Sequence, residues 1–235
     1  MKRLTLRPRD VVLDIGCGTG QTLLQLARLV GPDGGVIGVD AAPLLLDVAR
    51  RRTRRVCQIG LIEADAQALD LSDESADAVY SRFGVMGFRD PVAAFANLNR
   101  ILRPGGGLAF VCWRALQENE LDHFPLFTAG FGEAIDNTPF RFSDPDTIRQ
   151  TLALAGFRDI AIAPHDQFVS SGDLTQMTEV LLKVGPLGKI IRENPDLRAR
   201  VEPRLRDALA ARGGRDQVRL RASVWIVTGR ASRSP

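Results

Sequence analysis

Apolar residues along the first half of the chain fall into short runs, separated by longer stretches in which they recur every three or four positions. Short apolar runs bounded by glycine or aspartate predict strands buried on both faces, as in a parallel sheet, whereas the longer spacing predicts helices. The predicted strands are 11–15, 36–40, 59–62, 77–82 and 108–113, and the predicted helices are 21–30, 44–52 and 91–102. This regular alternation predicts a doubly wound α/β sheet.

The pattern changes after Trp113. Residues 114–142 combine His123 with scattered phenylalanines and polar residues and show no regular spacing. A helix is predicted from Ser143 to the glycine stop at Gly156, because Asp-Pro is a common helix start and glycine a common end. A sixth strand is predicted over 157–163.

A long insertion separates that strand from a seventh predicted strand, 218–228, which we expect to be antiparallel. The insertion contains apolar residues at helical spacing and an arginine-rich helix over 195–211, which Gly213 and Gly214 are expected to end. The residues at helical spacing are Leu174, Met177, Leu181 and Val184. The prediction is a seven-stranded, mostly parallel sheet with an inserted helical lid.

These patterns divide the chain into two parts. Residues 1–113 are predicted to form the cofactor-binding half of the α/β domain, and 114–235 the remainder of the sheet with two insertions, at about 114–142 and 166–216. We expect the insertions to form a mobile lid over a small-molecule acceptor. Idle helical decoration and a permanent subunit interface, as in a homodimer, are the alternatives.

Composition is that of a globular protein: 45% of the 235 residues are hydrophobic and 25% are charged. The net charge of +3 does not demand a nucleic-acid partner, and we expect none. The arginine cluster at 50–55 has no interleaved aromatic residues, so a solvated helix end is favoured over a nucleic-acid patch.

Three cysteines, Cys17, Cys57 and Cys112, lack metal-ligand spacing, so we expect no metal site and interpret them as buried free thiols. The start, Met1-Lys2-Arg3, precedes no apolar segment long enough for a signal peptide, and no run is long enough to span a membrane. A cytoplasmic enzyme is the expectation.

The segment after the first predicted strand carries the strongest chemical signal. Asp14 is followed by Gly16, Gly18 and Gly20, and a helix begins at Gln21. Glycines let the backbone turn sharply and approach a ligand, and the helix N-terminus presents free N–H groups. A dinucleotide fingerprint needs glycine where Gln21 stands, which weakens a nicotinamide interpretation.

Two further acids follow predicted strands. Asp40 ends the second strand, where a carboxylate can accept hydrogen bonds from both ribose hydroxyls of a nucleotide; a helix N-cap is the alternative role. Asp65 lies in the loop after the third strand, and an exposed loop acid without a ligand is its alternative role.

The stretch Leu13-Asp14-Ile15-Gly16-Cys17-Gly18-Thr19-Gly20 resembles the first motif of class I S-adenosylmethionine-dependent methyltransferases. The resemblance extends over 11–113, including the proline–glycine turn at 104–107. Ser81-Arg82-Phe83-Gly84-Val85-Met86 is similar to the fourth-strand segment of the quinone-biosynthesis methyltransferases, and the Asn-Pro-Pro-Tyr signature of nucleic-acid amine methyltransferases does not occur.

The resemblance implies roles for individual residues. The first turn would hold the amino-acid end of the cofactor, Asp40 and Ala41 the ribose, and Asp65 and Ala66 the adenine, while the fourth-strand segment would border cofactor and acceptor. The implied cofactor-binding residues are Asp14, Gly16, Cys17, Gly18, Thr19, Gly20, Asp40, Ala41, Asp65, Ala66, Ser81, Arg82 and Phe83.

The predicted function is in-line methyl transfer from S-adenosylmethionine to a small, apolar or aromatic acceptor. A general base is optional, and His123 and His165 are the only obvious candidates, each of which can equally be structural. Two alternatives remain open: a non-catalytic cofactor-binding module, and a nicotinamide-dependent oxidoreductase, which Gln21 and Asp65 disfavour.

Overall fold

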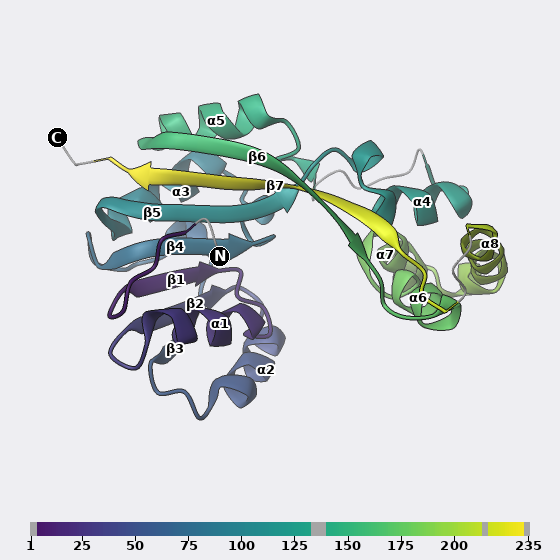
Figure 1. Ribbon diagram of the computed structural model, residues 1–235, viewed down its shortest axis with the longest axis horizontal. Helices are drawn as coiled ribbons and strands as arrows, with labels where there is room; N and C mark the ends of the chain where they lie inside the picture. Colours follow the sequence, from purple (N-terminus) through teal and green to yellow (C-terminus); the bar gives the residue numbers. More distant parts are fainter. Residues whose placement is uncertain (1–3, 133–139, 213–215, 233–235) are drawn as a thin grey trace. The chain divides into compact units, whose positions relative to one another are not determined.

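The computed structural model describes residues 4–132, 140–212 and 216–232. Its strands are β1 (Val11–Ile15), β2 (Gly35–Asp40), β3 (Ile59–Glu63), β4 (Ala76–Arg82), β5 (Leu102–Trp113), β6 (Phe157–Val169) and β7 (Leu220–Ala231). They form one sheet in the order β3-β2-β1-β4-β5-β7-β6 (Figure 1). The pairs β1–β2, β2–β3, β1–β4 and β4–β5 are parallel, and the arrow of β7 points against that of β5. The predicted seven-stranded, mostly parallel sheet is confirmed.

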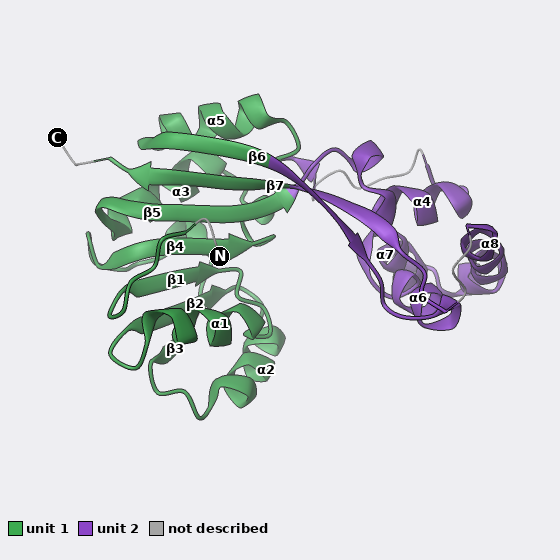
Figure 2. Ribbon diagram, viewed as in Figure 1, with its two compact units in different colours: residues 1–112, 142–163, 225–235 green, residues 113–141, 164–224 purple. Residues whose placement is uncertain are grey.

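Two compact units make up the chain (Figure 2). Unit 1 comprises 1–112, 142–163 and 225–235, and unit 2 comprises 113–141 and 164–224. Strands β6 and β7 each pass from one unit into the other along the sequence.

The helices of unit 1 alternate with its strands. They are α1 (Gln21–Val30), α2 (Pro43–Thr53), α3 (Pro91–Ile101) and α5 (Pro145–Leu154), with short 3-10 turns η1 (Ala66–Ala68) and η2 (Val85–Gly87). Three of the helices begin with proline, whose fixed φ suits the first helical position. The side chains of Asp90 and Asp144 accept hydrogen bonds from backbone N–H groups at the starts of α3 and α5.

Side-chain alternation along the strands produces two core layers in unit 1. Val12, Tyr80 and Ala109 face a cluster that includes apolar residues of α1 and α2. Phe110 of β5 points to the other face, where its ring lies 5.4 Å from that of Phe95 in α3. Both faces of the central strands are therefore covered, which explains the apolar runs of β1 and of the second half of β5, whereas the edge strand β6 is largely exposed.

Unit 2 is helical and has its own core. Its elements are η3 (Leu116–Glu118), α4 (Glu120–Thr128), α6 (Leu174–Leu181), α7 (Gly185–Glu193), η5 (Pro195–Leu197) and α8 (Arg198–Ala211). Leu126, Met177, Leu187 and Leu205, one from each of the four α-helices, are buried in one apolar cluster. Residues 114–141 and 166–216 belong to this unit, whereas residue 142 belongs to unit 1.

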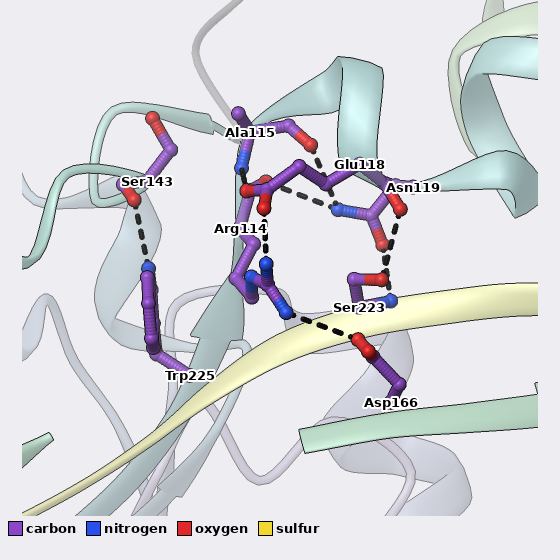
Figure 3. Close-up of polar contacts among 8 residues, drawn as sticks. All are labelled: Arg114, Ala115, Glu118, Asn119, Ser143, Asp166, Ser223 and Trp225. Atoms are coloured by element: carbon purple, nitrogen blue, oxygen red, sulfur yellow. Dashed lines mark hydrogen bonds and ion pairs between the residues drawn. The ribbon is translucent and has the colours of Figure 1, made fainter. Parts of the chain in front are cut away.

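Buried polar groups fix the local turns at the start of unit 2 (Figure 3). The side chain of Asn119 is fully buried, donates to the carbonyl oxygens of Arg114 and Ala115, and accepts from the Ser223 N–H at 2.7 Å. Arg114 pairs with Glu118 and Asp166. These bonds supply partners to polar groups that burial would otherwise make costly.

Several elements differ from their predicted extent. β5 begins at Leu102 instead of 108, because the glycine-rich segment continues the strand through an irregular register with β4 rather than forming a separate turn. β6 continues to Val169, and α4 and α7 were not predicted. Gly213 and Gly214, the predicted helix stop, lie outside the described residues, as do 133–139 of the first insertion.

The cysteine interpretation needs one correction. All three cysteines are free thiols, and Cys17 and Cys112 are buried, but Cys57 is exposed because it lies in the turn between α2 and β3. Among the described residues, no helix has the length and apolar composition to cross a membrane.

Candidate cofactor site

A cavity of about 450 Å³ lies in unit 1 where its parallel strands end. Ligands of open α/β sheets bind at these carboxyl ends. The last residues of β1, β2 and β4 all line it, together with the loop after β3. The lining consists of Ile15, Gly16, Gly18, Val39, Asp40, Ala41, Leu45, Ala64, Asp65, Ala66, Gln67, Arg82, Phe83, Gly84, Gly87, Phe88 and Arg89.

Two strand ends meet in close backbone contact at this cavity. A Cβ added to Gly16 would lie 2.5 Å from the Cα of Gly84, and one added to Gly84 would lie 2.3 Å from the Ile15 carbonyl oxygen. Neither clash can be relieved by rotating a side chain. The turn after β1 and the turn after β4 therefore both require glycine for their approach.

The carboxylate of Asp40 organises the turn after β1. One oxygen accepts a hydrogen bond from the Gly18 N–H at 2.8 Å, and the other accepts from the Ala42 N–H at 2.9 Å. The N-cap of α2 is Ala42, which makes no side-chain capping bond, so Asp40 is not the cap of this helix. Each carboxylate oxygen has a second lone-pair direction, so Asp40 can still accept from ligand hydroxyls.

Asp65 and Gln67 form a small polar network in the cavity lining. Asp65 accepts from both the backbone N–H and the side-chain amide of Gln67. The Gln67 side-chain oxygen in turn accepts from the N–H groups of Arg89 and Asp90 at 2.7 and 2.9 Å. The carboxylate is exposed but held in place by these bonds.

Asp14 lies in β1, just before the glycine turn, and is fully buried. Thr22 donates a hydrogen bond to its Oδ2, while Oδ1 has no partner among the described residues. Burial raises the pKa of this carboxyl from 3.8 to about 7, against the smaller lowering effects of the Thr22 bond and the Arg82 charge. An unpartnered buried carboxylate oxygen of this kind is suited to a cationic or hydrogen-bond-donating ligand group.

The end of β4 and the turn that follows it border the cavity, and the turn has unusual backbone geometry. Phe83 adopts φ +66°, a left-handed backbone conformation that residues other than glycine rarely adopt. Its N–H donates to the Val111 carbonyl at 2.9 Å. Ser81 is fully buried and donates to the Ile15 carbonyl at 2.7 Å. Strain of this kind next to a cavity is typical of ligand-binding positions.

The predicted cofactor residues divide into two sets. Those that line the cavity are Gly16, Gly18, Asp40, Ala41, Asp65, Ala66, Arg82 and Phe83. Those that do not are Asp14, Cys17, Thr19, Gly20 and Ser81. Thr19, in the second set, bonds within the protein: it accepts hydrogen bonds from Arg52 through both its carbonyl and its hydroxyl oxygen. Asp14 keeps one oxygen without a partner among the described residues.

Neither predicted base lies in this lining. His123 and His165 both belong to unit 2, where the His123 ring stacks on that of Phe127 and His165 is exposed on β6. Within the described residues, no group of three or more histidine, cysteine, aspartate or glutamate side chains could hold a metal ion.

Several lining residues were not predicted from the sequence. Gln67 and Arg89 follow Asp65 and Phe88 in segments whose shape no local pattern specifies. Gly84, by contrast, lies within the fourth-strand segment Ser81–Met86 that was predicted to border cofactor and acceptor, and a glycine after a buried strand indicates close backbone approach.

Comparisons with known proteins agree with this geometry. A family model described as a methyltransferase domain matches residues 12–106. The chain is 30% identical over 183 residues to the demethylmenaquinone methyltransferase of Staphylococcus carnosus, and the match covers 69% of this chain and 73% of that protein. It is 36% identical over 180 residues to the same enzyme of Staphylococcus aureus strain JH9, again covering 69% and 73%.

Solved structures share the fold at low sequence identity. The YcgJ protein of Bacillus subtilis matches with a TM-score of 0.66 at 18% identity, over 99% of this chain and 96% of that one. Phosphoethanolamine N-methyltransferase 2 of Haemonchus contortus, solved in complex with S-adenosyl-L-methionine, matches with a TM-score of 0.63 at 19% identity, over 99% of this chain and 51% of that one.

Proposed function

The chain belongs to the class I S-adenosylmethionine-dependent methyltransferases, and from this premise we propose that it methylates a small acceptor with an apolar or aromatic body. The donor is S-adenosylmethionine, which supplies a methyl group activated by a sulfonium centre. The observation that carries the proposal is the ordered set of strand ends around one cavity, with Asp40 after β2 and Asp65 after β3.

The residues present fit this cofactor. Asp14 does not line the cavity but directly precedes Ile15, which does, so its unpartnered Oδ1 would act as a negative charge beneath the cofactor's ammonium group. Ionisation of this carboxyl becomes favourable when a cation lies nearby. Asp40 would accept from the ribose hydroxyls while its bonds to Gly18 and Ala42 hold it in place. Asp65, oriented by Gln67, would accept from the adenine amino group.

Binding and orientation are the main tasks of the protein in such a reaction. Holding an acceptor atom in line with the methyl group can supply about 7–11 kcal/mol of the barrier, whereas a general base adds roughly 10²–10⁴-fold. His123 and His165 remain candidates for such a base. The relatives named as demethylmenaquinone methyltransferases favour a ring-containing acceptor for this chain as well.

We also propose that segments 114–142 and 166–216 take part in covering the acceptor. Their support is composition: the described part of unit 2 concentrates phenylalanine, methionine and leucine in its own cluster and along its surface. An apolar surface of this kind suits an acceptor that is itself mostly apolar. The reducing compartment expected for the free thiols Cys17 and Cys112 favours a cytoplasmic location.

Calorimetry tests the cofactor assignment directly. S-adenosylmethionine and S-adenosylhomocysteine should each bind the purified protein, and NAD should not. Tight binding of NAD with no binding of the other two would overturn the proposal. Incubation with radiolabelled donor and a panel of quinols, phenols and amines then tests catalysis, because a non-catalytic module would bind the donor and label none of them.

Hydrogen exchange tests the role of the two segments. Protection there should rise when cofactor and acceptor are both present, while the sheet of unit 1 changes little. If protection is unchanged by ligands and instead depends on protein concentration, the segments form a homodimer interface and the covering role is wrong.

A further inference from the structure

A second cavity lies wholly within unit 2, apart from the residues of the cofactor site. It has a volume of about 550 Å³, within the range of sites for small organic ligands. Its lining residues come from η3, α4, β6, the end of α8 and β7. They are Gln117, Glu120, His123, Phe124, Phe127, Phe168, Arg212 and Arg221.

The aromatic rings that line this cavity are unusually exposed. Phe127 is 71% exposed and Phe168 is 61% exposed, although phenylalanine is among the residues most often buried. The His123 ring is stacked on that of Phe127, with centroids 5.9 Å apart. Together they offer a flat apolar surface on which a planar ring can stack.

Two arginines provide the polar side of the cavity, and one of them is already neutralised. Arg212 pairs with Glu120 and lies over the Phe124 ring at 4.8 Å from its centroid. The second Glu120 oxygen accepts a hydrogen bond from the Arg221 backbone N–H at 2.9 Å. Glu120 is therefore engaged by Arg212 and by the main chain of β7.

The guanidinium of Arg221 is different. Within the described part of the chain, no hydrogen bond or ion pair reaches it, although it lines the same cavity. The charged side chains of the lining are Glu120, Arg212 and Arg221, so one positive charge remains after the first two are paired. A guanidinium in this position can bind a carboxylate through two parallel hydrogen bonds.

We propose that this cavity binds a small organic anion with a flat aromatic body, of the aryl carboxylate class. The phenylalanine rings account for the aromatic body, and Arg221 accounts for the anionic group. A neutral aromatic compound would leave Arg221 unpaired, and an inorganic anion would leave the rings exposed. No residue lines both this cavity and the cofactor cavity, so the proposal goes beyond the binding of the methyl donor.

The test uses 2-naphthoate as the probe and the full-length protein. Titration calorimetry should show that 2-naphthoate binds at least tenfold more tightly than 2-naphthalenemethanol, which lacks the charge, and than acetate, which lacks the ring. Arg221→Gln should weaken naphthoate binding roughly tenfold, since a charge-assisted hydrogen bond is lost. Phe127→Ser should weaken naphthoate and naphthalenemethanol alike.

Arg219→Gln is the matched control, because Arg219 lies two positions away, bonds to the Gln217 side chain and does not line the cavity. Its naphthoate affinity should equal that of the unchanged protein. Equal binding of 2-naphthoate and 2-naphthalenemethanol, or an Arg221→Gln variant with full affinity, would overturn the proposal. So would exposed rings that become protected with rising protein concentration and no ligand, since a second copy of the chain would then occupy the cavity.

Cofactor calorimetry on Arg221→Gln separates this proposal from the proposed function. S-adenosylmethionine affinity should be unchanged in this variant, because the residue lies outside the lining of the unit 1 cavity. Failure of naphthoate binding alone would therefore reject only the anion site.

Discussion

The two cavities are built from different parts of the chain. In unit 1 the Gly16 and Gly84 turns meet main chain to main chain, and the Asp40 carboxylate is already bonded to backbone N–H groups. In unit 2 the lining is rich in large side chains, with two exposed phenylalanines and a guanidinium that has no described partner. The shape of the first cavity is determined by the backbone of the sheet and its turns, whereas that of the second depends on the large side chains of unit 2.

The units also share one feature, a buried aspartate with a raised pKa. Asp14 of unit 1 has a pKa of about 7 and Asp122 of unit 2 a pKa of about 6, and burial is the largest cause in both. Asp14 directly precedes Ile15 in the lining of the cofactor cavity. Asp122 instead packs against Gly185 at the start of α7, where an added Cβ would lie 2.7 Å from its Oδ1. The two carboxyls should therefore respond differently to a bound cofactor.

Asp14→Asn should change the pH dependence of stability most. The folded pKa of about 7 exceeds the reference value of 3.8, so the folded state retains a proton that the unfolded state releases. Stability of the unliganded protein should therefore fall as pH rises from about 4 to 7, by on the order of 4 kcal/mol. In the Asp14→Asn variant, the free energy of unfolding measured with urea at pH 5 and pH 8 should no longer include this decrease. The cofactor affinity of the variant should also be lower.

The control for Asp14→Asn is Asp33→Asn, which removes one carboxylate from an exposed position outside the cofactor cavity. Bound S-adenosylmethionine should also reduce the loss of stability in the unchanged protein, because a cation favours the ionised carboxyl. An unchanged pH profile in the Asp14→Asn variant would contradict the burial argument.

Asp122→Asn should produce a similar but smaller change in unit 2. Its folded pKa of about 6 also exceeds the reference 3.8, so stability is fully present below about pH 4 and is lost as pH rises to about 6. The loss should be on the order of 3 kcal/mol. Unlike the stability loss caused by Asp14, the loss caused by Asp122 should persist when the cofactor is bound. Unfolding measured at pH 5 and pH 7, with and without cofactor, distinguishes the Asp122 contribution from the Asp14 contribution.

Gly84→Ala should destabilise unit 1 at the upper end of the roughly 1–3 kcal/mol range for overpacking, because the new methyl would meet the Ile15 backbone. Cofactor affinity should fall with it. Gly60→Ala is the matched control on β3, since an added Cβ there meets nothing within 4 Å. Thermal unfolding and calorimetry of both variants make the comparison, and equal melting temperatures would refute the close approach.

Asp40→Ala should weaken cofactor binding about ten- to hundredfold, since hydrogen bonds to a charged group contribute about 1.5–3 kcal/mol. Some stability should also be lost, because the N–H groups of Gly18 and Ala42 lose their acceptor. Asp40→Asn, which keeps one acceptor oxygen, should have a cofactor affinity between those of the unchanged protein and the Asp40→Ala variant. Calorimetry that finds full affinity together with a lowered melting temperature would assign Asp40 to the turn alone.

Gln67→Ala should have the smallest effect, a weakening of cofactor binding of roughly threefold to tenfold for about 1 kcal/mol of lost hydrogen bonding. Its amide links Asp65 to the main chain at Arg89 and Asp90. Gln67→Glu keeps the acceptor but places a like charge beside Asp65, so it should bind more weakly than the alanine variant. Competition binding with S-adenosylhomocysteine measures all three proteins, and an alanine variant with unchanged affinity would remove Gln67 from the site.

The sheet, and the polar residues at the carboxyl ends of its parallel strands, could be predicted from the sequence. Apolar runs, glycine turns and acids at strand ends are local features, and parallel strands bring their carboxyl ends to one side. The positions of Gly16, Asp40 and Asp65 in one cavity therefore followed from their order along the chain. The extent of β5 could not be predicted from the sequence, because glycines that favour a turn locally are held in a strand by pairing with β4.

The division between residues that line a cavity and residues that support its turn required the three-dimensional structure. Asp14 and Ser81 were predicted as cofactor-binding residues; both are fully buried outside the cavity lining, and Thr22 and the Ile15 carbonyl take up part of their hydrogen-bonding capacity. The cavity of unit 2 likewise joins α4 to Phe168 and Arg221, residues far apart along the chain. Packing between distant segments sets burial and charge pairing, and no local pattern carries that information.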